Sequence, residues 1–179
     1  KSNMKIREII NKIDEQHLFV PMFQREYVWK RKDVKNLIDS LIKDYPTGTM
    51  LTWETTNPPE VKGEYVKEVD FSSKGPVKLI LDGQQRITTL YLLMKGEIPP
   101  YYNEKEILHD VKGLYVNVET LSLEYYKKTT MENDPLWVNI TGIFQGSVDI
   151  FNIIEQLEDK EKNIDIGKDR QKLIFKNVT

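Results

Sequence analysis

The sequence predicts an α+β protein, in which helices and small sheets follow one another without a regular βαβ series. Two amphipathic helices stand near the start of the chain, and a strand-like run at residues 76–81 passes almost directly into a third helix. Further strand-like runs and then helical runs fill the remainder. The predicted order is therefore helix, extended piece, helix, strands, helix, strands and helices.

The first two helices are predicted from apolar spacing. Over residues 4–14, isoleucine recurs at the i, i+3, i+4 and i+7 positions of one helical face. Residues 19–21 are expected to be extended, because a residue before proline is disfavoured in the α region. Residues 32–45 then form the clearest helix, Pro46 ends it, and Thr47-Gly48 is predicted to turn the chain. The apolar face of this helix is predicted to hold Val34, Leu37, Ile38, Leu41, Ile42 and Tyr45.

Strands are predicted around the third helix. Residues 49–54 are rich in strand formers, and residues 64–71 and 76–81 are predicted as two strands joined by a hairpin-like loop at 72–75. The third helix runs to Met94 and ends at Lys95-Gly96. Beyond a polar and aromatic loop at 99–110, strands are expected at 113–118 and 137–140, and helices at 148–157 and 170–175.

The composition is that of a globular protein and excludes several classes of chemistry. The chain has 179 residues, of which 39% are hydrophobic and 30% are charged. No apolar run approaches the ~20 residues that span a bilayer, and no signal peptide is visible, so a cytoplasmic protein without a membrane partner is expected. The absence of cysteine excludes disulfides, thiolate catalysis and cysteine-ligated zinc.

The charge distribution is uneven but weak. Residues 1–43 carry ten Lys and Arg against six Asp and Glu, whereas the rest of the chain carries sixteen against twenty-two. This excess is too small to predict a nucleic-acid surface by itself, and an ordinary mixed-charge surface is the favoured interpretation.

The stretch LILDGQQR at residues 79–86 is the first candidate site. Its strand ends at Asp82, and Gly83 permits a tight turn and a close approach of the backbone to a ligand. The following helix begins with unpaired N–H groups and a positive partial charge that suit a phosphate. Gln84 and Gln85 add amide donors and acceptors, and Arg86 can grip a phosphate with two hydrogen bonds. Asp82 can hold a metal ion, orient a water molecule or cap the helix.

A purely structural interpretation of the same stretch is favoured by local physics alone. Asp82 would cap the helix, Gly83 would make the turn, and Arg86 would pair with a surface carboxylate. The dipeptide Asp-Gly is common, whereas the string DGQQR is much less so.

The second candidate motif is FVPMFQREYVW at residues 19–29. Arginine occurs only five times in the chain, and Gln24-Arg25 is the second Gln-Arg pair at the mouth of a predicted element. Arginine among aromatic residues can stack on a nucleobase. The alternative is that the aromatic side chains are core and that Arg25 is a structural clamp.

Other familiar sites are excluded. His17 and His109 are far apart and lack the spacing of a zinc site, and no P-loop, GxGxxG or GxSxG pattern is present.

Several segments, taken in order, resemble one known family. They look like the N-terminal domain of GmrSD-type, DGQQR-motif proteins, and the resemblance covers most of residues 4–146. The matching segments are IREII, FVPMFQREYVWKRKDVKNLIDSLIKDYPTGTMLTWE, LILDGQQRITTLYLL, LYVNVE and PLWVNITGIF.

The resemblance implies a fold similar to the ParB/sulfiredoxin superfamily: a small mixed sheet flanked by helices, with additional C-terminal helices. In that superfamily a nucleotide phosphate sits on a helix N-terminus beside a Gly-x-x-Arg sequence, which Gly83–Arg86 match here. Sulfiredoxins carry a nucleophilic cysteine at the position of Gln84, so their chemistry is excluded. Residues 4–146 are expected to form this domain, and residues 147–179 to begin a helical extension that is truncated here.

The function implied by the resemblance is that of a regulatory domain that binds or hydrolyses NTP in a modification-dependent restriction or phage-defence protein. The separate nuclease domain is not expected in this chain, and DNA is contacted through the full-length protein. Asp82, Gln84 and Gln85 are the candidate catalytic residues, and Asp82 is the candidate ligand of Mg²⁺. The candidate nucleotide-binding residues are Gly83, Arg86, Gln24, Arg25 and Tyr27. The alternative is a non-catalytic module that senses DNA or a partner, in which DGQQR is structural.

Overall fold

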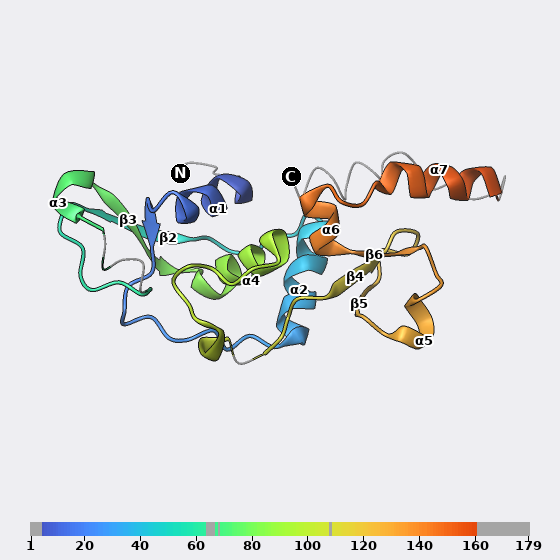
Figure 1. Ribbon diagram of the computed structural model, residues 1–179, viewed down its shortest axis with the longest axis horizontal. Helices are drawn as coiled ribbons and strands as arrows, with labels where there is room; N and C mark the ends of the chain where they lie inside the picture. The colour runs from blue at the N-terminus through green and yellow to red at the C-terminus, as the bar shows by residue number, and fades with distance from the viewer. Residues whose placement is uncertain (1–4, 64–66, 68, 108, 161–179) are drawn as a thin grey trace. The chain divides into compact units, whose positions relative to one another are not determined.

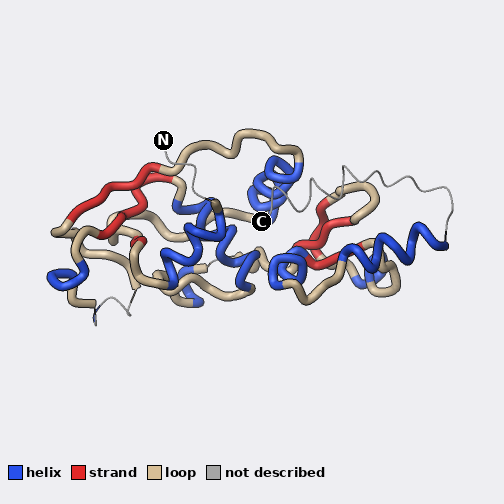
Figure 2. Tube along the Cα trace, turned by 90° about the horizontal axis from the view of Figure 1, so that it is seen from above, coloured by secondary structure: helices blue, strands red, loops and turns tan. Residues whose placement is uncertain are grey.

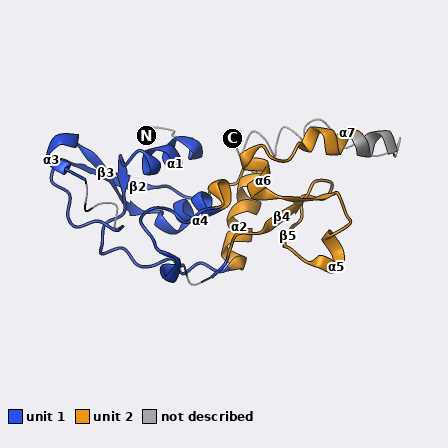
Figure 3. Cartoon of the chain, viewed as in Figure 1, with its two compact units in different colours: residues 1–30, 48–92, 97–110 blue, residues 31–47, 93–96, 111–179 orange. Residues whose placement is uncertain are grey.

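The computed structural model describes residues 5–63, 67, 69–107 and 109–160. It confirms the α+β class, with helices and two three-stranded sheets (Figure 1). The chain divides into two compact units that alternate along the sequence (Figure 3). Unit 1 comprises residues 1–30, 48–92 and 97–110, and unit 2 comprises residues 31–47, 93–96 and 111–179.

Unit 1 is built around a mixed sheet. Its elements are α1 (Ile6–Asp14), β1 (Leu18–Phe19), β2 (Leu51–Thr55), α3 (Phe71–Lys74), β3 (Val77–Asp82), the main part of α4 (Gln84–Lys95) and the 3-10 helix η2 (Glu104–Glu106). The strand order is β1-β3-β2, with β1 parallel and β2 antiparallel to β3. Long loops join these elements, as Figure 2 shows in tan.

One buried cluster of unit 1 lies on one face of this sheet, and Leu18 and Ile80, which alternate to the other face, are buried as well. Phe19 and Trp53 both align with Leu79 on the central strand. The buried cluster on this face consists of Phe19, Val61, Val77 and Leu79. Phe71 packs against it, with its ring edge-on to Phe19 at a centroid distance of 5.2 Å. The apolar run predicted for β3 is therefore explained by its central place in the sheet.

Helix α4 begins directly after β3 and is buried along most of its length, so its polar residues need internal partners. Thr88 and Thr89 are fully buried. The Thr88 hydroxyl lies 2.9 Å from the hydroxyl of Tyr101, and the Thr89 hydroxyl donates to the Gln85 carbonyl at 2.8 Å.

Unit 2 holds an antiparallel sheet of strand order β5-β4-β6. Its elements are α2 (Arg31–Ile42), β4 (Leu114–Asn117), β5 (Leu123–Tyr125), α5 (Lys128–Met131), β6 (Trp137–Asn139), α6 (Ile140–Gln145) and α7 (Ile150–Lys160). The buried cluster of this unit consists of Val118, Val138, Ile150 and Ile154.

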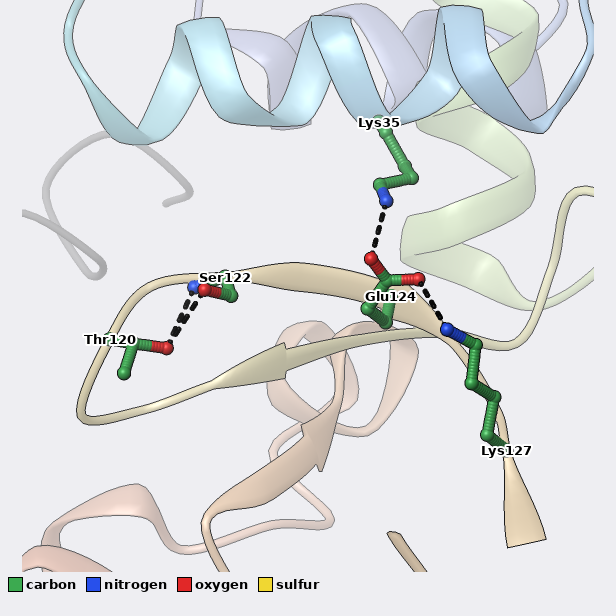
Figure 4. A network of polar contacts seen from close by, with 5 residues as sticks. All are labelled: Lys35, Thr120, Ser122, Glu124 and Lys127. Carbon is green, nitrogen blue, oxygen red and sulfur yellow. Dashed lines mark hydrogen bonds and ion pairs between the residues drawn. The ribbon is translucent and has the colours of Figure 1, made fainter. Parts of the chain in front are cut away.

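Polar contacts join helix α2 to the sheet of unit 2 (Figure 4). Lys35 donates to Glu124 on β5 at 2.9 Å, and the other carboxylate oxygen of Glu124 lies 3.3 Å from the Lys127 ammonium group. The hydrogen bond from Lys35 lowers the pKa of Glu124. The guanidinium of Arg31 stacks 4.5 Å above the centre of the Tyr125 ring.

Most of the predicted elements are confirmed, including the helices at 6–14, 31–42 and 84–95 and the strands at 77–82, 114–117 and 137–139. The second helix ends at Ile42, before Tyr45, which is 61% exposed. The predicted helix at 170–175 lies outside the described residues.

The segment before β3 differs from the prediction. The described residues of 64–71 contain no strand, and residues 71–74 form the short helix α3 in place of most of the expected hairpin-like loop. The reason is a cap, because the Asp70 carboxylate accepts a hydrogen bond from the Ser72 N–H at 3.0 Å.

In the part of the chain that the structure describes, no helix has both the length and the apolar composition needed to cross a membrane.

Candidate functional site

The DGQQR junction forms the predicted strand–turn–helix. Strand β3 ends at Asp82, Gly83 has φ +91°, and α4 begins at Gln84. The Ile87 N–H donates to the Gly83 carbonyl at 3.0 Å, which opens the helix. A positive φ favours glycine, so the sharp change of direction depends on Gly83. The first N–H groups of such a helix lack intrahelical acceptors and are directed out of its N-terminus.

A polar cavity of about 190 Å³ lies at this junction, entirely within unit 1. Both candidate motifs supply its walls, although more than fifty residues separate them in the chain. The lining residues are Gln24, Arg25, Trp29, Asp82, Gly83, Gln84, Gln85 and Arg86. The structure thus brings together every predicted site residue except Tyr27.

Gln84 holds the backbone of the second motif. Its side chain is buried, and its amide nitrogen donates to the Arg25 carbonyl at 3.0 Å. The Tyr102 hydroxyl donates to the same carbonyl at 2.9 Å and is itself in hydrogen-bond contact with the Gln84 amide. Burial raises the pKa of Tyr102 well above its usual value, so its hydroxyl remains a donor at physiological pH.

Gln85 continues this arrangement one residue further. Its amide nitrogen donates to the Glu26 carbonyl at 2.8 Å, and its amide oxygen accepts from the Val28 N–H at 2.9 Å. In return, the amide of Gln24 donates to the Leu81 carbonyl at the end of β3, at 2.8 Å. The amides of both motifs therefore bind each other's backbone and fix the shape of the cavity.

Tyr27 lies in the interior and not in the cavity wall. It is fully buried, and its hydroxyl lies 2.8 Å from the Thr89 hydroxyl on α4. Trp29, which is half-buried, is the aromatic residue of this segment that lines the cavity.

Arg86 lies in a narrow slot beside the cavity. Its guanidinium donates to the Thr49 carbonyl and lies 3.7 Å from the Asp82 carboxylate. A Cβ atom at Gly48 would lie 2.4 Å from Nη1 of Arg86, and one at Gly83 would lie 3.1 Å from Nη2. Two glycines thus make room for this side chain, which is only 21% exposed.

The charges of the lining favour an anion. The lining residues include two arginines, Arg25 and Arg86, against one carboxylate, Asp82, whose side chain is 71% exposed. No cluster of three or more His, Asp or Glu side chains suited to a metal occurs among the described residues. The donor set fits Mg²⁺ only where a ligand supplies further oxygens, as phosphates do, with Asp82 as the protein carboxylate.

Sequence reasoning missed two contributors to this site. Tyr102 comes from the predicted polar and aromatic loop at 99–110, and no spacing in the sequence links it to Arg25. The role of the Thr49 carbonyl could not be recognised from the sequence either. The turn predicted at Thr47-Gly48, where Gly48 has φ +90°, was the one indication of it.

Fold and site together define a DGQQR-type domain, in which an α+β unit places a polar cavity at a strand-to-helix junction. Residues 6–178 match the family described as "GmrSD restriction endonuclease, N-terminal domain", and the chain belongs to this family. The match includes residues 147–178, which the sequence analysis set apart as a separate extension.

The chain is also similar to a curated protein of Methanocaldococcus jannaschii, "Uncharacterized protein MJ0686". The two are 36% identical over 90 residues, which make up 47% of this chain and 16% of that protein. The chain therefore aligns with less than a fifth of its relative's length.

Proposed function

We propose that this domain binds the phosphate groups of a nucleoside triphosphate at the DGQQR junction and thereby regulates DNA cleavage by the full-length protein. The observation that carries the proposal is the cavity itself, whose lining combines two arginines with the N-terminus of a 12-residue helix. Both features favour a polyanion. Family membership supplies the link to restriction of DNA.

The size of the cavity supports the phosphates as the enclosed part of the ligand. At about 190 Å³ it is smaller than the roughly 300–1,000 Å³ of sites that enclose whole drug-sized ligands. The sugar and base would then lie toward the surface, where Trp29 offers an aromatic face.

Magnesium would accompany the triphosphate, held by Asp82 and by phosphate oxygens. Its chemical contribution when bound is to neutralise phosphate charge. We further propose hydrolysis, in which Asp82 orients the attacking water. Gln84 and Gln85 would act through the segment that they hold, because their amides bind the carbonyls of Arg25 and Glu26.

Nucleotide titration tests this function. The four common nucleoside triphosphates, with Mg²⁺, are titrated into wild type and Arg25→Ala, while phosphate release and the melting temperature are followed. We expect a nucleotide-dependent rise in melting temperature that Arg25→Ala reduces. Arg7→Ala, at an exposed position on helix α1 of the same unit, serves as the control because it also removes one positive charge. Equal shifts in all three proteins would contradict the proposed site.

The second candidate is the non-catalytic module that senses DNA or a partner protein. The observation favouring it is that the Gln84 and Gln85 amides are used to hold backbone, as a structural motif would use them. This function predicts no melting shift with any nucleotide but retention on DNA. A steep loss of retention with salt would show that the contact is made to phosphates.

A further inference from the structure

Tyr102 connects a third segment of unit 1 to the cavity. It lies in the loop before η2, where its N–H donates to the Pro99 carbonyl at 3.0 Å. Its side chain is 7% exposed, and its hydroxyl donates to the Arg25 carbonyl at 2.9 Å. Since Gln84 donates to the same oxygen at 3.0 Å, two side chains from different segments fix this one carbonyl.

The ring of Tyr102 is itself held on two sides. The ring of Tyr101 packs edge-on against it at a centroid distance of 5.1 Å. The ammonium group of Lys62, a residue only 6% exposed, lies 5.1 Å from the ring centre. A cation at this distance is attracted to the aromatic face, so it favours the observed ring position. The hydroxyl therefore reaches the Arg25 carbonyl from a constrained position.

We infer that Tyr102 is a positioning residue for Arg25. Its hydroxyl fixes the backbone of Arg25 so that the arginine side chain can bind a phosphate of the ligand. This inference rests on the proposed function. The side chain of Arg25 is exposed, so its direction depends on the backbone that carries it. Fixing that backbone before binding reduces the ordering cost of gripping an anion. Tyr102 does not line the cavity and acts through the Arg25 carbonyl.

Two neighbouring tyrosines provide a matched pair of variants. Tyr102→Phe removes the hydroxyl that holds Arg25, whereas Tyr101→Phe removes a buried hydroxyl that contacts Thr88 within the core. We expect Tyr102→Phe to weaken triphosphate binding about fivefold to tenfold, the effect of one hydrogen bond. Tyr101→Phe should leave the affinity unchanged.

A second readout separates positioning from a general loss of stability. In an Arg25→Ala background, Tyr102→Phe should cause no further loss of affinity, because its effect passes through Arg25. Amide hydrogen exchange of residues 25–28 should rise in Tyr102→Phe and stay unchanged in Tyr101→Phe.

The possible failures are distinguishable. If wild type binds none of the four nucleoside triphosphates, the proposed function is wrong, and the inferred effect of Tyr102 on nucleotide affinity is wrong as well. If wild type binds and Arg25→Ala weakens binding, but Tyr102→Phe has wild-type affinity, the inference alone is overturned. Additive losses in the double variant would equally overturn it.

Discussion

The side-chain amide of Gln85 donates to the Glu26 carbonyl at 2.8 Å, across 59 residues of sequence. The same side chain accepts from the Val28 N–H at 2.9 Å, so one glutamine replaces both hydrogen bonds that a neighbouring strand would offer. The segment at 24–28 is thereby held in place without belonging to a sheet strand.

Replacing Gln85 with leucine should therefore destabilise the domain. Two backbone groups would lose their partner at a position only 8% exposed, which costs roughly 2–4 kcal/mol of unfolding free energy. Denaturant unfolding measures this loss. Gln24→Leu, which removes the single bond to the Leu81 carbonyl, is the comparison and should cost about half as much. Equal losses of unfolding free energy in the two variants would show that the two hydrogen bonds of Gln85 stabilise the domain no more than the single bond of Gln24.

Gly48→Ala should disturb both stability and the site. The φ of +90° strains any other residue by about 1–2 kcal/mol, and the new methyl group would meet the Arg86 guanidinium. Gly113→Ala is the control, because it has φ +68° with no heavy atom within 4 Å of the added Cβ. We expect both variants to lower the melting temperature and only Gly48→Ala to weaken triphosphate binding. A normal affinity in Gly48→Ala would exclude a role for the position of Arg86.

Replacing either of the two cavity arginines, Arg86 or Arg25, should change the stability of the domain to a different extent. The Arg86 guanidinium donates to the Thr49 carbonyl and fills a slot. Arg86→Ala should therefore lose about 1.5–3 kcal/mol of unfolding free energy, because a charged donor is removed. Arg25 is exposed, so Arg25→Ala should change stability by less than about 0.5 kcal/mol. Thermal unfolding without ligand distinguishes them, and similar losses in both variants would contradict this assignment.

Glu124 should make the stability of unit 2 depend on pH. The hydrogen bond from Lys35 lowers the pKa of Glu124 in the folded state (Figure 4). Its contribution is then fully present above the unfolded carboxyl pKa of about 4.3 and is lost as pH falls through the lower folded value. Since the side chain is 38% exposed, we expect less than about 1 kcal/mol.

Melting temperatures of wild type and Glu124→Gln, measured from pH 7 to pH 3, test this dependence. The difference between them should narrow at acid pH. Glu132→Gln, which breaks the exposed pair with Lys128 at 3.6 Å, is the control for a simple change of charge. A difference that stays constant across this range would contradict the expected linkage.

The parts of the fold that the sequence predicts are those that depend on local periodicity. The isoleucines of α1, the apolar face of α2 and the run from β3 into α4 all repeat at spacings that a single segment reveals. Helix α6, which was missed, depends instead on a single side-chain hydrogen bond. Helix α6 begins where Asn139 accepts from the Gly142 N–H at 3.1 Å, inside a run that was predicted as a strand up to residue 140.

Strand β5 was missed for a related reason. The turn before it places Leu121 at φ +60°, although leucine is not a turn-forming residue. The side chain of Asn117 stabilises this turn by accepting from the N–H groups of Glu119 and Thr120 at 3.1 and 3.0 Å. The sequence of this turn lacks the Asn-Gly or Asp-Gly dipeptide that would predict a hairpin.

For the site, sequence reasoning could group the two Gln-Arg motifs but could not orient their side chains. A glutamine beside a helix mouth can face a ligand or a backbone, and Gln84 and Gln85 face the Arg25–Val28 backbone. Tyr27 and Trp29 differ by two positions in an extended segment, and only the structure shows which one reaches the cavity. Long-range contacts decide both points, and a single sequence does not contain them.

The slot around Arg86 has a consequence for comparing this chain with its relatives. The guanidinium rests where Gly48 and Gly83 leave out a Cβ atom, so bare peptide forms the two walls of the slot. A related chain that keeps DGQQR but carries a bulkier residue at the place of Gly48 must seat its arginine differently. Gly48 is therefore part of the geometry that seats Arg86, and the residue at its place can be used to sort relatives into those that can share this geometry and those that cannot.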